Sequence, residues 1–313
     1  MENYTLTVSV HKGTCTEAHL NHNRRTIFVP HADKNRLYLD RAYIDMSVEQ
    51  AYHIKFDKAL EEYNKGKKPS RRIENYYEHI KAQYEKGEQA IQQARSRGAS
   101  RKEIALLKAK RPVLFSEIIV TVSNCQAHNG DFACGGKMEQ TSIDILDEYV
   151  ATFSERNPHL FVFSAHKHLS EQTPHVHIDY IPWTDRKGRG LPVRVSENGA
   201  FVQQGLTNGE RGNIGTIAFQ EQERDALSEI AQKRGISIAE NKHTKRFGFR
   251  FWKVAIYSSN IPTVIASLLP PQANKPSYAS HEPTVTISSL NNTGRFAFNF
   301  AISLRLAPRE RAC

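Results

Sequence analysis

The sequence predicts an α+β fold in which one antiparallel sheet is backed by helices. Two β-prone segments, residues 160–166 and 173–183, are separated by a short turn, which is typical of an antiparallel hairpin. The remaining β-prone segments are few, and amphipathic helical segments lie between them in the chain. Because strands are few and helices are interspersed, we expect a single sheet with helices packed against it.

The first half of the chain predicts one strand followed by a pair of helices. Residues 4–10 alternate in polarity and are rich in β-forming residues, which predicts a strand. Helical periodicity begins at Ser47, where Gln50 resembles the second half of a capping box, and Gly-Lys-Lys-Pro-Ser at 66–70 interrupts it. We therefore predict an inserted helical hairpin over about 47–93, whose Lys and Arg residues either lie on a solvated surface or face DNA.

The second half adds a strand and two helices around the hairpin of strands. Residues 115–122 are β-prone and predict a strand. A helix is expected from about 141 to 155, because the following Asn157-Pro158 pair disfavours helical backbone. A later helix is expected over 217–234, and Gly235 is a typical residue directly after a helix.

Length and charge restrict the class of protein. A chain of 313 residues allows one large domain or two of ordinary size. It contains no run of about 18 apolar residues and no secretory signal, so we expect no membrane span and a cytoplasmic location. The 43 Lys and Arg residues exceed the 33 Asp and Glu residues. The resulting net charge of +10 favours nucleic acid as the partner, ahead of an anionic membrane surface.

The composition changes near residue 250. Only 6 of the 43 basic and 2 of the 33 acidic residues lie in 251–313, and this segment has no clear helical or strand pattern. We therefore predict one domain over 1–245 and an atypical low-charge tail over 246–313. A frameshift, a recombination junction or a truncated gene would explain such a tail.

A group of histidines carries the chemical information in this sequence. Side chains two residues apart on a strand share a face, so His175 and His177 project together, and His168 lies across the turn. Three imidazoles on one face predict a divalent-cation site that favours Mn²⁺, Zn²⁺, Ni²⁺, Co²⁺ or Fe²⁺ over Mg²⁺. Three protein ligands leave open positions, as catalytic sites do, and Glu171 in the turn is a candidate general base. The alternative is a chance cluster of structural histidines, which the spacing disfavours.

These residues also resemble a known family. The segment from His168 to His177 resembles the His-x-Asp-Glu-x-x-Pro-His-x-His signature of the Mob/Pre plasmid mobilisation and recombination proteins, the MobV-type relaxases of the HUH endonuclease superfamily. The sequence His22-Asn23-Arg24-Arg25 resembles the first motif of that family, His-Asn-x-Arg. Further matches are Gly188–Leu191, Arg194–Ser196, Gln203–Gly205 and the strand Glu117–Val122. The resemblance spans about residues 3–245, but Ser170 stands where the family usually has Asp.

The resemblance implies a fold, a cofactor and a reaction. The expected metal lies on the face of the sheet, held by His168, His175 and His177, with Mn²⁺ favoured and Mg²⁺ also allowed. The implied reaction is metal-dependent nicking and rejoining of one DNA strand at a plasmid transfer origin, through a covalent 5′-phosphate–histidine intermediate. In that reaction His22 is the nucleophile. Glu171 activates its ring, and Arg25 clamps the phosphate or orients His22.

Several alternatives stay open from the sequence. Tyr38 and Tyr43 compete with His22 as nucleophile, because most relatives in the wider superfamily use tyrosine. A catalytically silent DNA-binding relic that regulates its own origin would fit Ser170 and the unusual tail. A metal-dependent phosphoesterase that uses water as nucleophile is a third possibility. The implied partners are plasmid DNA, single-stranded at the nick site, and the conjugative coupling machinery.

Overall fold

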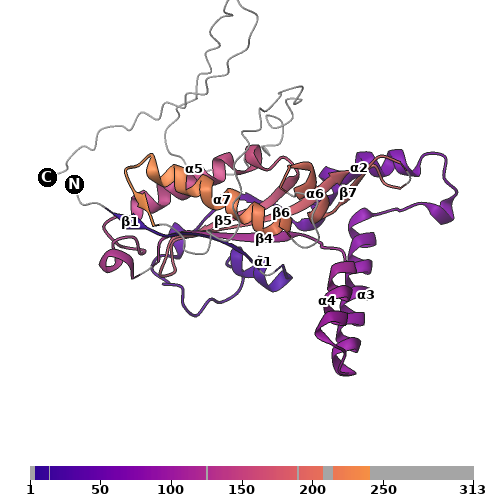
Figure 1. The fold of residues 1–313 in the computed structure, drawn as a ribbon, viewed down its shortest axis with the longest axis horizontal. Helices are drawn as coiled ribbons and strands as arrows, with labels where there is room; N and C mark the ends of the chain where they lie inside the picture. Colours follow the sequence, from indigo (N-terminus) through magenta and orange to yellow (C-terminus); the bar gives the residue numbers. More distant parts are fainter. Residues whose placement is uncertain (1–3, 14, 125, 189, 207–213, 240–313) are drawn as a thin grey trace, which may run out of the picture. The chain divides into compact units, whose positions relative to one another are not determined.

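An antiparallel sheet is the centre of the fold. The computed structural model describes residues 4–13, 15–124, 126–188, 190–206 and 214–239 (Figure 1). The strand order of the sheet is β2 (Val8–Lys12), β4 (Ser116–Val122), β6 (His175–Asp185), β5 (Leu160–His168) and β3 (Arg41–Asp45), and β7 (Val193–Val195) pairs with the end of β6. Every pairing in it is antiparallel, which confirms the predicted fold class. The predicted tail over 246–313 lies outside the described residues.

The β5–β6 hairpin occupies the middle of the sheet, as predicted. β6 pairs with β4 on one side and with β5 on the other, so most of its length is buried. Its register places His175 opposite His168 and His177 opposite His166. The histidines of both strands therefore meet at the end of the sheet where the hairpin turns.

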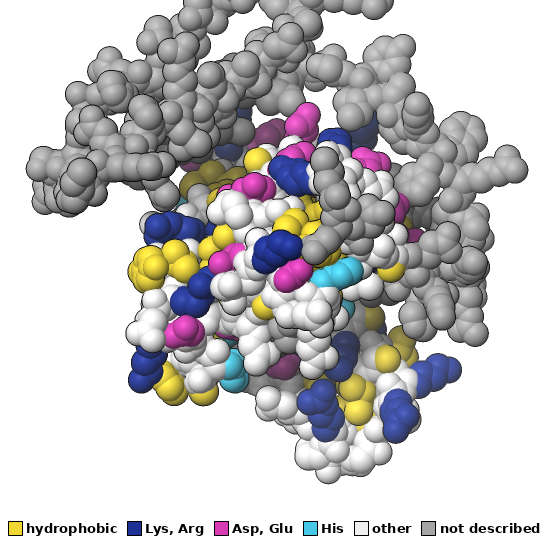
Figure 2. Space-filling model, turned by 90° about the vertical axis from the view of Figure 1, so that its left-hand side faces the viewer, with side chains coloured by type: hydrophobic (Ala, Val, Ile, Leu, Met, Phe, Trp, Pro, Cys, Tyr) yellow, Lys and Arg dark blue, Asp and Glu magenta, His cyan; other side chains and the backbone are white. Residues whose placement is uncertain are grey.

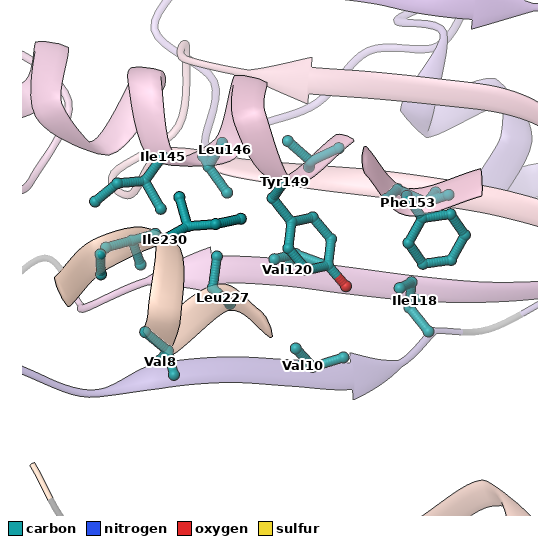
Figure 3. Close-up of a cluster of buried hydrophobic side chains, with 14 of the residues drawn as sticks. Val8, Val10, Ile118, Val120, Ile145, Leu146, Tyr149, Phe153, Leu227 and Ile230 are labelled. Carbon is teal, nitrogen blue, oxygen red and sulfur yellow. The ribbon is translucent and has the colours of Figure 1, made fainter. Parts of the chain in front are cut away.

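One face of the sheet is covered by two helices, α5 (Glu139–Arg156) and α7 (Ile214–Gln232), which also contact each other. Alternate residues of the strands point to this face and pack with the helices (Figure 3). The labelled members of this core are Val8, Val10, Ile118, Val120, Ile145, Leu146, Tyr149, Phe153, Leu227 and Ile230. Burial of each large apolar side chain contributes about 1.5–3 kcal/mol, so this layer is a main source of stability.

The opposite face carries a second core and the polar residues. Helices α1 (Glu17–Asn23), α2 (Val48–Asn64) and α3 (Tyr76–Ser96) contribute to it, and α1 lies across the sheet from α5 and α7 (Figure 1). Tyr52 and Phe56 of α2 pack with Phe163 and Ile181 of the hairpin. This face also carries buried hydrophilic residues, among them Glu117, Ser164 and Asp179, and Asn23 at the end of α1 bonds to Glu117 and Asp179.

The inserted helices extend further than predicted. Ser47 and Gln50 form the predicted capping box, because each side chain bonds to the other residue's backbone N–H. After α2, a short 3₁₀ turn η2 (Pro69–Arg71) leads into α3, and α4 (Arg101–Lys110) then packs against α3. The predicted limit near residue 93 is therefore too early. The sequence did offer a start signal for α4 that the prediction did not use, because Ser100 and Glu103 have capping-box spacing and Ser100 Oγ accepts from the Glu103 N–H.

Several short elements were not predicted. They are α1, β3, β7, α6 (Glu197–Gln203), the 3₁₀ turns η1 (Leu37–Leu39) and η3 (Ala127–Gly130), and β8 (Ser237–Ile238), which pairs in parallel with β1 (Thr5–Leu6), the first part of the strand predicted over 4–10. Most span seven residues or fewer, too few to establish a period in the sequence. Contacts with distant segments determine them instead.

A buried carboxylate joins α5 and α7. The side chain of Glu223 is fully buried and accepts hydrogen bonds from Tyr149 Oη (2.6 Å), Asn157 Nδ2 (2.8 Å) and Arg156 Nη2 (2.8 Å). Glu223→Ala leaves the Tyr149 hydroxyl without its acceptor and removes the carboxylate partner of Asn157 and Arg156, so we expect it to lower the free energy of unfolding by about 3 kcal/mol. Denaturant unfolding measures the loss.

Glu229→Ala is the matched control, because Glu229 lies exposed on the same helix. We expect it to change the free energy of unfolding by less than about 0.5 kcal/mol. Equal stabilities of the Glu223 and Glu229 variants would contradict the structural role of Glu223.

Candidate metal centre

The structure brings the three predicted histidines together. His168 ends β5, and His175 and His177 lie two residues apart at the start of β6. The ring centroid of His168 lies 5.1 Å from that of His175 and 4.8 Å from that of His177, and the last two are 5.0 Å apart. The antiparallel register across the hairpin produces this cluster.

One ring nitrogen of each imidazole lies within hydrogen-bond distance of an oxygen. His168 Nε2 lies 2.9 Å from the Asn23 carbonyl oxygen, and His175 Nδ1 lies 2.8 Å from the Thr173 carbonyl oxygen. His177 Nδ1 lies 2.7 Å from Glu117 Oε1. A carbonyl oxygen only accepts, so for His168 and His175 the bonded nitrogen carries the proton and the other nitrogen keeps a lone pair.

The free nitrogens fit a metal ion. His168 Nδ1 and His177 Nε2 are buried and have no hydrogen-bond partner. A buried polar atom without a partner is costly, and a metal ion satisfies a nitrogen lone pair. Burial lowers the pKa of His168 and of His175, which keeps these rings neutral as metal ligands must be. The donor set present therefore suits a divalent cation.

His22 reaches the cluster from the last turn of α1. Thr16 caps the start of this helix through a hydrogen bond to the His19 N–H, and Leu20 buries its inner face. The ring centroid of His22 lies 5.4 Å from that of His168 and 5.6 Å from that of His177. Burial lowers the pKa of His22, so its ring is neutral near neutral pH.

Two compact sets of donor atoms arise from this arrangement. Donor atoms of His22, His168 and His177 lie within 4.8 Å of one another, and so do those of His168, Glu171 and His175. Glu171 and His22 therefore lie close enough to the histidine cluster to act on a group bound there. Their individual roles stay predictions.

Glu171 and Arg25 form an ion pair beside His22. Arg25 Nη2 donates to Glu171 Oε1 at 2.8 Å, and His22 Nε2 lies 3.5 Å from the same oxygen. Burial favours a higher pKa for Glu171, but the neighbouring His175 and the bond from Arg25 outweigh it and lower the pKa. The Nη1 atom of Arg25 is buried without a partner. This geometry provides an ionised carboxylate facing His22 and a buried guanidinium nitrogen without a hydrogen-bond partner.

Asp40 is a site residue that the sequence did not reveal. Its side chain is 8% exposed and accepts from the Leu169 N–H (2.7 Å), the Ser170 N–H (2.9 Å), Ser170 Oγ (2.7 Å) and Arg25 Nε (2.7 Å). One carboxylate thus connects Arg25 to the turn that carries Glu171. Ser170, where the family usually has Asp, contacts a carboxylate supplied by another segment. No motif marks Asp40, which lies 130 residues before Ser170 in the chain.

A buried polar network lies behind the histidines. Asn23 Nδ2 donates to Glu117 Oε1 (2.9 Å) and Asp179 Oδ2 (3.1 Å), and Ser164 Oγ donates to Asp179 Oδ2 (2.8 Å). Burial, followed by the charge of Glu117, raises the pKa of Asp179 to about 7. A Cβ atom at Gly13 would lie 1.8 Å from Glu117 Oε2, so a side chain there would displace this carboxylate.

Of the two candidate tyrosines, Tyr43 is half-buried on the other face of the sheet and Tyr38 is exposed on the loop after α1. A register shift in β3 at Tyr43 places its hydroxyl against Asp147 of α5, on the face opposite to the histidines. Burial and that hydrogen bond raise the pKa of Tyr43. Tyr38, in η1, is 71% exposed.

Comparison with known proteins identifies the family. Residues 29–249 match the family described as plasmid recombination enzyme (Mob_Pre), and this match covers more than half of the chain. The chain therefore belongs to the plasmid recombination enzyme family, as its motifs predicted. No match was found among curated proteins.

Solved structures of one relaxase domain are similar to this chain. One is the MobM relaxase domain (MOBV; Mob_Pre) bound to a 22-nucleotide plasmid pMV158 oriT DNA, and another is the same domain with a 3′-thiophosphate, both Mn-bound. Each is 16% identical to this chain, with a TM-score of 0.41. The similarity covers 78% of this chain and 95% of the MobM domain.

The role of Asp40 leads to a stability prediction. Asp40→Ala leaves the N–H groups of Leu169 and Ser170 and the Arg25 guanidinium without their acceptor. We expect it to lower the free energy of unfolding by about 2–3 kcal/mol. Asp40→Asn, which keeps one acceptor oxygen, is expected to fall between the parent and Asp40→Ala in denaturant unfolding.

Asp57→Ala serves as its control, because Asp57 is 49% exposed on α2 and contacts His53. A surface ion pair of this kind contributes under about 1 kcal/mol. If Asp40→Ala were no less stable than Asp57→Ala, the carboxylate would not hold the turn.

Proposed function

We propose that this chain is a relaxase that nicks and rejoins one strand of plasmid DNA at a transfer origin. Its family consists of plasmid recombination enzymes, and a strand must be cut and rejoined in any such exchange. The observation that carries the proposal is the pair of buried, unpartnered nitrogens, His168 Nδ1 and His177 Nε2, beside His22. The similar MobM domains are complexes with oriT DNA and Mn, and the proposal extends both partners to this chain.

The proposed metal ligands are His168, His175 and His177. Imidazole donors favour Mn²⁺ over Mg²⁺, although the nearby Glu171 carboxylate allows Mg²⁺ as well. The bound cation supplies charge neutralisation at the scissile phosphate. Glu117 and the carbonyl oxygens of Asn23 and Thr173 orient the three rings through their second nitrogens.

His22 is the proposed nucleophile, in preference to either tyrosine. Its neutral ring has a lone pair for attack on phosphorus, and the ring nitrogen facing Glu171 passes its proton to that carboxylate. A P–N bond forms, the P–O3′ bond breaks, and the 3′-oxygen takes up a proton and leaves as a hydroxyl. The 5′-phosphate stays on His22, and reversal of the step rejoins the strand.

Arg25 is the proposed phosphate clamp. Its Nε and Nη2 atoms are held by Asp40 and Glu171, so the guanidinium plane is fixed while Nη1 has no partner. A fixed guanidinium offers charge-assisted hydrogen bonds to phosphate oxygens as negative charge develops. The same ion pair holds Glu171 next to His22.

The proposed partners and location follow from charge and family. The net charge of +10 supports DNA binding, and Figure 2 shows Lys and Arg side chains spread over the visible face rather than gathered in one patch. In the described part of the chain, no helix has the length and apolar character needed to cross a membrane. We further propose a cytoplasmic location, the coupling machinery of conjugation as partner, and a catalytic domain over 1–245.

Removal of one ligand tests the metal site. We expect His175→Ala to abolish high-affinity Mn²⁺ binding, because its imidazole is one of three ligands on one strand hairpin. Isothermal titration calorimetry measures this affinity. Mn²⁺ is also expected to raise the melting temperature of the parent and not that of the variant.

His53→Ala is the control for a histidine outside the site, because His53 is exposed on α2. It should bind Mn²⁺ as the parent does. Unchanged Mn²⁺ affinity in a folded His175→Ala variant would exclude His175 as a ligand.

The chemistry of the adduct tests the nucleophile. With supercoiled origin DNA and Mn²⁺, we expect a covalent protein–DNA adduct whose P–N bond is labile in acid and fairly stable in alkali. His22→Ala should bind DNA and Mn²⁺ yet form no adduct on a denaturing gel.

Tyr38→Phe and Tyr43→Phe are the matched variants, and both should still form the adduct. An acid-stable adduct that persists in His22→Ala and is lost in one tyrosine variant would assign the reaction to tyrosine. Cleavage without any adduct would instead show that water is the nucleophile.

A further inference from the structure

An exposed aromatic loop lies between α1 and β3. Eight large hydrophobic side chains are exposed among the described residues, and four of them lie in this one loop: Ile27, Phe28, Leu37 and Tyr38. Phe28 is 73% exposed and Tyr38 is 71% exposed, so neither ring contributes much to the core. Single exposed apolar residues are ordinary, but a concentration of them in one segment marks a binding surface.

The exposed aromatic loop is anchored beside the histidine cluster. It follows α1, whose last turn carries His22, and it leads into Asp40. The Asp33 N–H donates to the Ser170 carbonyl oxygen at 2.6 Å, and Arg36 Nε donates to the Leu169 carbonyl oxygen at 3.0 Å. These bonds attach the loop to the two residues that directly follow His168 in the chain. The aromatic rings therefore project from a segment that forms the edge of the proposed site.

The charge around the loop narrows the choice of partner. Of the five Lys and Arg residues in 24–41, Arg24, Arg25 and Arg36 form ion pairs with carboxylates. The other two adjoin the exposed rings: Lys34 Nζ lies 5.7 Å from the centroid of the Phe28 ring, and Arg41 donates to the Tyr38 carbonyl oxygen. Cations interspersed with exposed rings suit a polyanion that presents flat apolar groups. Single-stranded DNA is such a partner. A duplex keeps its bases stacked inside the helix, and an apolar protein surface carries no negative charge to pair with the cations.

We propose that Phe28 and Tyr38 stack on unpaired bases of the DNA strand next to the scissile phosphate. This inference rests on the proposed function and adds to it a binding surface for the bases. A phosphate at the histidine cluster places the flanking nucleotides along the loop that follows His22. Because every base has a flat face, this contact distinguishes single-stranded from duplex DNA without reading its sequence.

Binding of the full chain to three labelled DNAs of equal length tests the surface. The probes are a mixed-sequence single strand, an abasic strand with the same number of phosphates, and the mixed-sequence duplex. We expect Phe28→Ala and Tyr38→Ala each to weaken binding of the mixed-sequence single strand roughly tenfold at fixed salt. Neither should change binding of the abasic strand or the duplex, since these probes offer phosphates without accessible bases.

Ring-retaining and distant variants are the controls. Phe28→Trp and Tyr38→Phe keep an aromatic face and should bind as the parent does. Leu106→Ala removes an apolar side chain that is 56% exposed on α4, and should also leave binding unchanged. All of these side chains are exposed, so circular dichroism should show folded variants.

Four results would overturn the inference. In the first, the double variant Phe28→Ala, Tyr38→Ala binds single strands as tightly as the parent, and the parent cuts origin DNA. That result would refute the stacking surface and leave the proposed function intact. Equal losses on the abasic strand would show that the loop acts through charge or shape. A loss of self-association, measured by sedimentation of the variant without DNA, would assign the surface to a second copy of the chain. A parent that neither binds single strands nor cuts would refute both proposals.

Discussion

The two-residue period of β6 at the centre of the sheet is the constraint on which the rest of the structure depends. Val176, Ile178 and Tyr180 point into the core beneath α5 and α7, which fixes the intervening positions on the other face. Those positions hold His175 and His177, and a one-residue slip would exchange the two sets. The apolar core therefore sets the position of the proposed metal-site histidines as firmly as any contact among them.

Burying so many polar groups on one face requires a partner for each. Asn23 at the end of α1 meets the Glu117 and Asp179 side chains, and its carbonyl oxygen meets His168. Asp40 likewise accepts hydrogen bonds from the backbone N–H groups of Leu169 and Ser170 in the turn after His168. Unpaired polar groups cost about 1–3 kcal/mol each, so the bond from Asn23 that orients His168 also holds α1, and the bonds to Leu169 and Ser170 hold the exposed aromatic loop. Two of the nitrogens left without a partner, His168 Nδ1 and His177 Nε2, are those that the proposed cation would satisfy.

Local patterns in the sequence were sufficient to predict the main strands and helices and the shared face of the histidines. The central hairpin, the long helices and the face shared by His175 and His177 follow from periodicity, and the motifs predicted the family. Asp40 and the Glu117–Asp179 pair were missed because their partners lie far away in the chain, and a lone acidic residue has no period. The face of the sheet on which Tyr43 lies could not be predicted either, because it depends on a register shift in β3 that the residue types do not indicate.

The placement of the metal-site histidines on a hairpin also bears on the order in which the chain folds. Closing the six-residue turn between β5 and β6 costs little chain entropy, whereas β2 joins β4 across more than a hundred residues. Pairing of the hairpin is thus the least costly early step, and it assembles three imidazoles before the outer strands arrive. The segment carrying His22 and Asp40 is synthesised first, but the partners of Asn23 and Asp40 at residues 168–170 follow much later in the chain. We therefore expect the proposed cation site to assemble before His22, the proposed nucleophile, is in place.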